Sequence, residues 1–172
     1  MASENTGCGR TARILSTYHF FRYCEEVELN TLQKAFSVSA KTAQRDMALL
    51  ERAGVLRVRF DKKRGAYVPA SLALEPMAEG ENETRRRYLA KIRRICVFMA
   101  ELEGCDDSPV ELYRSLFPAL TARTRQRDFA ALKELGYGLR YMAAFYDEPG
   151  QWSVEIPPAF GLDTISQTVQ WW

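Results

Sequence analysis

The sequence predicts a mainly α-helical protein with small β-hairpins, in which one structural unit occurs twice. The first observation is an internal repeat: the sixteen residues from Ser39 to Gly54 recur 82 positions later, from Thr121 to Gly136, with eight identities. The second is the pattern of apolar residues at helical spacing, with capping residues at the expected helix ends. Because self-similarity at a fixed offset reveals the architectural unit, we expect two tandem copies of one module.

The first copy reads as three helices and a hairpin. Helices are predicted from Thr11 through ARILSTYHFFRYC and over residues 29–36. Ser39 can cap the third helix by accepting a bond from a free backbone N–H, and Gly54 suits the left-handed position that closes it. In residues 55–68, VLRVRF alternates like a strand, DKKRG turns and AYV returns. This is the element order of a winged helix-turn-helix.

The second copy repeats this plan. A long helix is predicted over residues 84–102, and Ser108-Pro109 is a capping serine followed by proline at the first helical position. Pro118 stops that helix, and Thr121 caps the next. GLRYMAAFY, the turn DEPG and QWSVEI then supply a second hairpin.

The predicted organisation is therefore two tandem winged helix-turn-helix domains. The first covers residues 10–70, and a linker rich in acids, with Pro76 and Gly80, covers 71–83. The second domain covers residues 84–158, and 159–172 form a C-terminal tail that ends in two tryptophans.

Charge distribution is more informative than net charge, which is only +2. From Thr31 to Val68 there are nine Lys or Arg against three Asp or Glu, and from Thr84 to Arg94 six against none. Basic patches are typical of surfaces that bind polyanions, although charge runs alone also fit an ordinary solvated face.

Other classes of function are disfavoured by what the sequence lacks. The four cysteines show no CxxC spacing and there is one histidine, His19, so we expect no metal site and no cofactor. There is no phosphate-binding Gly-rich loop and no suggestive pair of carboxylates, so we do not expect an enzyme. Without a signal-peptide h-region or a long apolar run, we expect a cytoplasmic, nucleoid-associated protein of a bacterium or phage.

The outward stripe of the third helix has the chemistry of a DNA-reading surface in both copies. In the first copy Lys41, Gln44 and Arg45 share one helical face with the small Ala48. Arg can bind both acceptors of guanine, and Gln can pair bidentately with adenine. The alternative is that these residues form an ordinary solvated helix face. However, a repeated fold requires only the buried positions to recur, and here the exposed polar residues recur as well. The corresponding stripe in the second copy is Arg123, Gln126, Arg127 and Ala130.

Further contacts are expected around these helices. Hydroxyls and free N–H groups at the helix N-termini can hold phosphate oxygens, and the basic turn DKKRG can reach the DNA backbone. Arg125 stands where the first copy has Ala43. It either makes an additional DNA contact or indicates that this helix packs differently on its module. Asp46 and Asp128 are expected to orient a neighbouring arginine. The candidate DNA-binding residues are Ser39, Lys41, Thr42, Gln44, Arg45, Lys62, Lys63, Arg64, Thr121, Arg123, Thr124, Arg125, Gln126 and Arg127.

Residues 37–68 resemble the winged helix-turn-helix of DeoR-type regulators, including the N-terminal module of WYL-domain transcription factors. The family pattern Ser-x-x-Thr-x-x-Arg-Asp-x-x-x-Leu-x-x-x-Gly, followed by a basic wing ending in Gly-x-Tyr, is met here by Ser39, Thr42, Arg45, Asp46, Leu50, Gly54, Gly65 and Tyr67. The second copy is a looser match, with Gly150 and Trp152 in place of the wing's Gly and Tyr. The resemblance implies DNA-binding transcriptional regulation. No sensor domain is recognisable, so a small-molecule effector is not supported.

The resulting hypothesis is a sequence-specific double-stranded DNA-binding regulator, with repression favoured over activation and a homodimer expected. The alternative is a protein-interaction module, an antirepressor or assembly subunit, in which the second winged helix mediates dimerisation or partner binding. Asp147 and Glu148 in the second hairpin turn and the aromatic tail favour that role for the second copy, because acidic side chains repel a phosphate backbone.

Overall fold

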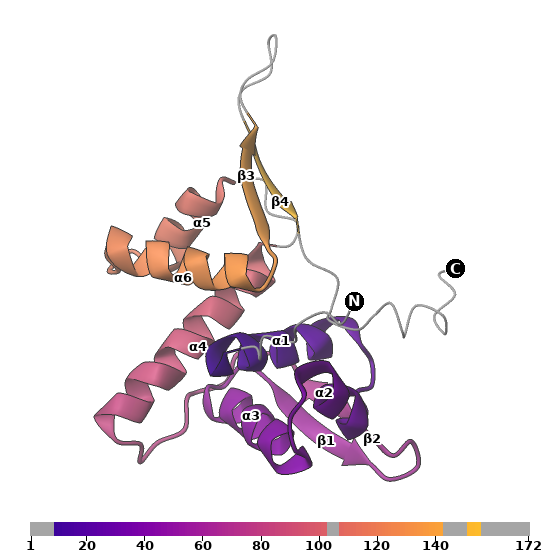
Figure 1. The fold of residues 1–172 in the computed structure, drawn as a ribbon. Helices are drawn as coiled ribbons and strands as arrows, with labels where there is room; N and C mark the ends of the chain where they lie inside the picture. The colour runs from indigo at the N-terminus through magenta and orange to yellow at the C-terminus, as the bar shows by residue number, and fades with distance from the viewer. Residues whose placement is uncertain (1–8, 103–106, 143–150, 156–172) are drawn as a thin grey trace. The chain divides into compact units, whose positions relative to one another are not determined.

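The computed structural model describes residues 9–102, 107–142 and 151–155, and these are mainly helical with two antiparallel hairpins (Figure 1). This confirms the predicted class, mainly α with small β-hairpins. In this part of the chain no helix is both long enough and apolar enough to span a membrane. The boundary between two compact units falls inside a helix, between Arg93 and Arg94. The domain limits predicted from the sequence stay a prediction.

The first unit follows the predicted order of three helices and a hairpin. The repeat from Ser39 to Gly54 forms its third helix with both flanking caps, and the basic turn joins its two strands. Its elements are α1 (Arg10–Tyr23), α2 (Leu29–Phe36), α3 (Ala40–Arg52), β1 (Arg57–Asp61) and β2 (Ala66–Ser71).

The second unit repeats that order, beginning with the later part of a long helix. Its hairpin strands pair antiparallel, as do those of the first unit. The turn DEPG lies outside the described residues, as does the C-terminal tail. The remaining elements are α4 (Glu83–Glu101), α5 (Pro109–Leu116), α6 (Ala122–Glu134), β3 (Gly138–Met142) and β4 (Gln151–Glu155).

The predicted helix caps are confirmed. The hydroxyl of Ser39 accepts the backbone N–H of Thr42 at 3.2 Å, and Thr121 does the same for Thr124 at 3.3 Å. Ser108 caps α5, whose first residue is Pro109. A side-chain oxygen at this position satisfies a donor that has no partner inside the helix, which explains why these helices start where they do.

The helices α1, α2 and α3 form the core of the first unit. Ile14, Leu15 and Phe20 of α1 are fully buried with Leu32 of α2 and Leu50 of α3. Helical spacing predicts Ile14, Leu15, Tyr18 and Phe21 on one face of α1, and all four are buried. Phe20 and His19, which the spacing does not place on that face, are buried as well. In the second unit the corresponding apolar side chains include Ile95, Phe98, Tyr113 and Leu132.

A short backbone bridge that the sequence did not predict attaches the first hairpin to the helices. Val27, in the acidic stretch between α1 and α2, pairs with Tyr67 of β2. The Val27 N–H donates to the Tyr67 carbonyl at 2.8 Å, and the Tyr67 N–H donates to the Val27 carbonyl at 2.9 Å. The hairpin is therefore tied to the segment that precedes α2.

The C-terminus of α3 gives a stability prediction. Gly54 has φ +68°, and a Cβ there would collide with the Glu75 carbonyl oxygen and the Arg93 guanidinium. Gly65 has nearly the same φ, +66°, but no neighbouring atom lies within 4 Å of the place that a Cβ would take. We expect Gly65→Ala to cost about 1 kcal/mol from backbone strain alone, and Gly54→Ala to cost about 3 kcal/mol because the collision adds to that strain. Urea unfolding measures both; equal losses would contradict the steric account.

Candidate nucleic-acid interface

The outward stripe of α3 is exposed, as a binding surface requires. The side chains of Lys41, Gln44, Arg45 and Ala48 all lie in contact with solvent, and none of the three charged or amide groups is buried. Among the described residues, Lys41 and Arg45 form no ion pair, so their charges are available to a ligand. The opposite face carries Met47 and Leu50 into the core, as predicted.

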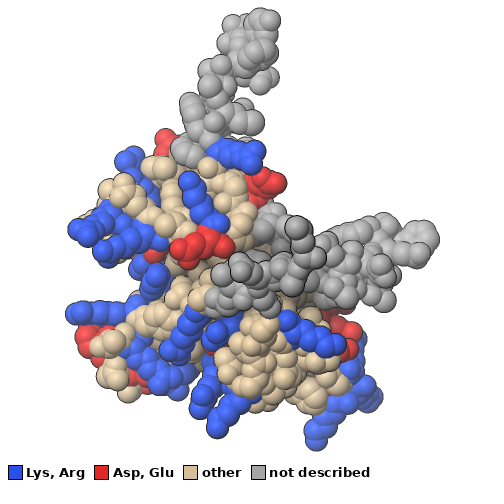
Figure 2. Space-filling model, in the orientation of Figure 1, with Lys and Arg blue, Asp and Glu red and all other residues tan. Residues whose placement is uncertain are grey.

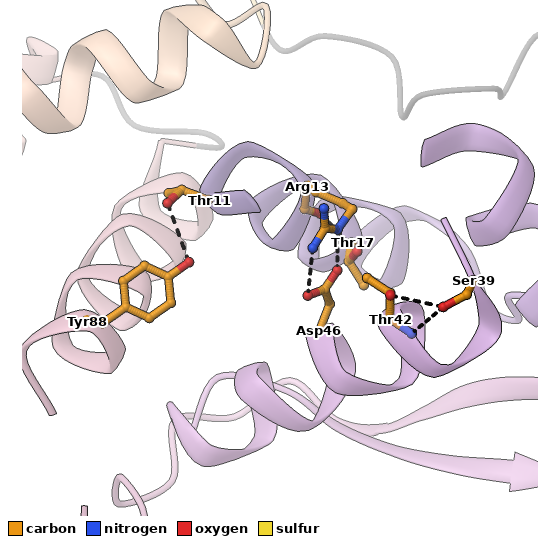
Figure 3. Close-up of polar contacts among 7 residues, drawn as sticks. All are labelled: Thr11, Arg13, Thr17, Ser39, Thr42, Asp46 and Tyr88. Carbon is orange, nitrogen blue, oxygen red and sulfur yellow. Dashed lines mark hydrogen bonds and ion pairs between the residues drawn. The ribbon is translucent and has the colours of Figure 1, made fainter. Parts of the chain in front are cut away.

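One residue of the repeated Gln-Arg-Asp motif faces inward and anchors the helix. Asp46 is 2% exposed, and its carboxylate accepts two hydrogen bonds from the Arg13 guanidinium of α1, at 2.5 and 3.3 Å (Figure 3). A bidentate pair of this kind fixes direction as well as distance. The predicted role of Asp46, to orient a neighbouring arginine, is therefore seen in the first unit, and Arg13 is the arginine.

The second unit contains the same anchor. Asp128, 1% exposed, accepts hydrogen bonds from Arg94 of α4 at 2.6 and 3.1 Å and from the hydroxyl of Tyr113 at 2.7 Å. Burial and the hydrogen bond to Asp128 raise the pKa of Tyr113, so the phenol stays protonated and donates. In both units a carboxylate on the third helix thus binds an arginine on the first helix of the unit.

Arg93 holds the C-terminal end of α3. Its guanidinium donates to the carbonyl oxygens of Ala53 at 2.9 Å, Gly54 at 3.1 Å and Glu75 at 2.5 Å. The last carbonyls of a helix have no partner inside it, and a cation is favourable beside them. The helix that presents the candidate stripe is therefore fixed at its middle and at its end.

The hydroxyls predicted to bind phosphate lie at the helix N-termini in matched pairs. The oxygens of Ser39 and Thr42 are 3.0 Å apart (Figure 3), and those of Thr121 and Thr124 are 3.1 Å apart. In each pair one hydroxyl hydrogen occupies the contact between the two oxygens, and the other remains able to donate. The first backbone N–H groups of a helix also lack acceptors within it, so each site keeps donors for an anion.

The turn of the first hairpin presents its basic residues to solvent. Lys62, Lys63 and Arg64 are exposed, and the Asp61 carboxylate shapes the turn by accepting the backbone N–H groups of Lys63 at 2.9 Å and Arg64 at 3.3 Å. Arg64 is engaged in an ion pair with Glu26 at 3.1 Å. Within the described part of the chain, the two lysines have no such partner.

Charged side chains gather where these elements lie. In the lower part of Figure 2, separate blue side chains project from a largely tan surface, near α3 and near the end of the β1–β2 hairpin. The exposed basic residues of these two elements include Lys41 and Arg45 of α3 and Lys62, Lys63 and Arg64 of the turn. The structure therefore brings the predicted residues of the first unit onto exposed positions of two adjoining elements.

The second unit matches the first in its helix and differs in detail. Arg123, Gln126 and Arg127 are exposed on α6, while Arg125 is half-buried where α3 carries the buried Ala43. Phe129 is also half-buried, with its ring stacked on Phe98 at 5.4 Å between centroids. The expected acidic residues of the second turn, at positions 147 and 148, lie outside the described residues.

Sequence reasoning missed the arginines that anchor these helices. Arg13 and Arg94 precede their carboxylate partners by 33 and 34 residues. Sequence alone assigns an arginine of an amphipathic helix to the solvent-facing side, and Arg94 also belongs to the basic run of residues 84–94. The one available signal was Asp46 itself, whose repetition at Asp128 pointed to a basic partner but not to which one.

Comparisons with protein-family models, with curated proteins and with solved structures give no match to this chain.

The buried anchor gives a second stability prediction. Asp46→Asn removes the charge that compensates the largely buried Arg13, so we expect a loss of about 3 kcal/mol in the free energy of unfolding. Glu83→Gln is the matched control, because it breaks an ion pair with Arg87 in which both side chains are exposed, and it should cost less than about 0.5 kcal/mol. Chemical denaturation of the two variants tests this, and a similar small loss in both would show that Asp46 is no anchor.

Proposed function

We propose that this chain is a sequence-specific double-stranded DNA-binding transcriptional regulator with two winged helix-turn-helix modules of the DeoR type. The observation that carries the proposal is the exposed Lys41, Gln44 and Arg45 stripe beside the buried Asp46 anchor. The same division between exposed and buried residues recurs on α6. Three helices followed by an antiparallel hairpin, present in both units, support the winged-helix assignment.

In this proposal α3 enters the major groove, which is wide enough for one α-helix. Arg45 binds guanine, Gln44 binds adenine, and Ala48 allows close approach of the helix to the base edges. The hydroxyls of Ser39 and Thr42, together with the first backbone N–H groups of the helix, hold a phosphate and set the register.

The hairpin turn supplies sequence-independent affinity. Lys62 and Lys63 are exposed and have no ion-pair partner in the described residues, so they can neutralise backbone phosphates without first breaking a contact. Each phosphate neutralised releases counterions, which makes the affinity fall as salt rises.

The second module carries the same helix stripe, Arg123, Gln126 and Arg127, and reads a second half-site in this proposal. Alternatively, a homodimer could place the same module of each chain on one half of a palindrome. This would also give two half-sites, but related by a two-fold axis. Repression by occupancy of a promoter is the regulatory mode that we favour.

A pair of matched variants tests the reading helices. We expect Lys41→Ala/Gln44→Ala/Arg45→Ala to weaken binding to the preferred duplex at least about 100-fold, because it removes the base contacts of Gln44 and Arg45, worth about 1–3 kcal/mol each, together with the positive charge of Lys41. The preferred duplex is first selected from a random library, and affinities are measured by fluorescence anisotropy at two salt concentrations.

The control is Arg86→Ala/Arg87→Ala, which removes the same number of positive charges from exposed positions on α4 outside the candidate DNA-binding residues. It should lower affinity much less than the triple variant, through the loss of charge alone, and leave the base preference unchanged. Arg123→Ala/Gln126→Ala/Arg127→Ala reports whether the second module reads DNA. If the unaltered protein binds no duplex at low salt, or if the first triple variant binds as well as the control, the proposal is wrong.

The salt dependence tests the hairpin turn. Lys62→Ala/Lys63→Ala should weaken binding to all sequences by a similar factor and reduce the slope of log affinity against log salt by about two, since one phosphate contact accounts for a slope of about 0.9. A slope equal to that of the unaltered protein would show that the turn does not touch DNA. A loss confined to one sequence would assign the lysines to base contacts instead.

A further inference from the structure

Gln44 is linked to the hairpin by a hydrogen bond between side chains. Its amide nitrogen donates to the hydroxyl oxygen of Tyr67 on β2 at 3.2 Å. Gln44 is otherwise an exposed, flexible side chain in the middle of the candidate reading stripe. Tying down such a side chain before binding removes an entropic cost that binding would otherwise carry.

Tyr67 is itself held from two sides. Its backbone N–H and carbonyl both pair with Val27, at 2.9 and 2.8 Å. Its ring meets the ring of Phe60, its partner across the hairpin, edge-on at 5.2 Å between centroids. Phe60 is 51% exposed, so it is placed against Tyr67 without belonging to the core. The phenol is therefore a fixed acceptor beside the reading helix.

The remaining hydrogen-bonding groups of Gln44 have the arrangement that adenine requires. A glutamine amide has two N–H groups and one carbonyl oxygen, and Tyr67 occupies one N–H. The second N–H and the oxygen remain as an adjacent donor and acceptor. Adenine in the major groove offers the complementary pair, the N7 acceptor and the N6 donor.

We propose that Tyr67 is a positioning residue for base recognition: it holds the Gln44 amide in the orientation that reads adenine, and so sets the specificity of the first module at one base pair. The inference rests on the proposed DNA-binding function and adds a residue to it. Phe60 supports the orientation of Tyr67 and makes no base contact in this account.

The test removes only the hydroxyl. For the unaltered protein, each base pair of the selected duplex is replaced in turn, and the position whose preference disappears in Gln44→Ala is assigned to Gln44. We expect Tyr67→Phe to lower the ratio of affinities at that position about threefold to tenfold, the cost of one unrestrained side chain. The salt slope and the preferences at other positions should stay the same. Tyr88→Phe is the matched control, because it removes a tyrosine hydroxyl on α4 that lies 3.4 Å from the Thr11 hydroxyl, and it should leave the ratio unchanged.

A double-variant comparison separates positioning from a general structural effect. In the Gln44→Ala background, Tyr67→Phe should change the base preference no further, because the side chain that it positions is gone. An unchanged ratio in Tyr67→Phe, or an equal loss of affinity for every duplex, would overturn this inference and leave the proposed function standing. An unaltered protein without any base preference would overturn the proposed function itself.

Discussion

A buried carboxylate helps to determine which face of each third helix points outward. Asp46 and Asp128 bind arginines of the first helices, Arg13 and Arg94, through paired hydrogen bonds. Since successive residues of a helix are about 100° apart, a carboxylate fixed inward places the residue two positions before it, Gln44 or Gln126, on the opposite face. The apolar residues beside the carboxylate, which include Met47 and Leu50 in α3, are buried and set which of the two flanks faces solvent. The two residues before the carboxylate are Gln-Arg in both helices. The ionic contact and the buried apolar side chains together present the exposed stripe of each third helix.

Consecutive arginines of α4 support different third helices. Arg93 binds the carbonyl groups that end α3, whereas Arg94 binds the carboxylate in the middle of α6. In the second unit Tyr113 adds a third hydrogen bond to Asp128, for which no counterpart on Asp46 is among the described contacts. The two anchors are thus alike in their ionic contact and different in the side chains around it. This is the expected result when two copies of a unit retain the same ion pair and the side chains that pack around it differ between the copies.

Local sequence signals were sufficient for the helices, and long-range partners were not. Ser39, Thr121 and Ser108-Pro109 identified helix starts because a cap acts on backbone groups three residues away. Gly54 identified an end for the same local reason. The outward position of the stripe also followed from helical spacing. No periodic pattern encodes a contact between residues far apart in the chain. Such contacts are the ion pairs of the anchoring arginines, the backbone bridge from Val27 to Tyr67 and the hydrogen bond from Gln44 to Tyr67.

The two copies agree where a helix would read DNA and differ where a hairpin would. Folding explains the recurrence of Asp46 and of the apolar positions, because both are buried, but any polar residue would serve at an exposed position. Folding alone therefore does not account for the recurrence of Gln44 and Arg45 as Gln126 and Arg127, whereas the proposed contact with a common kind of ligand would. The hairpins carry Lys62-Lys63 in one copy and Asp147-Glu148 in the other. A shared reading helix with unlike hairpins is the pattern expected of two modules that bind one duplex with unequal contributions from the backbone phosphates.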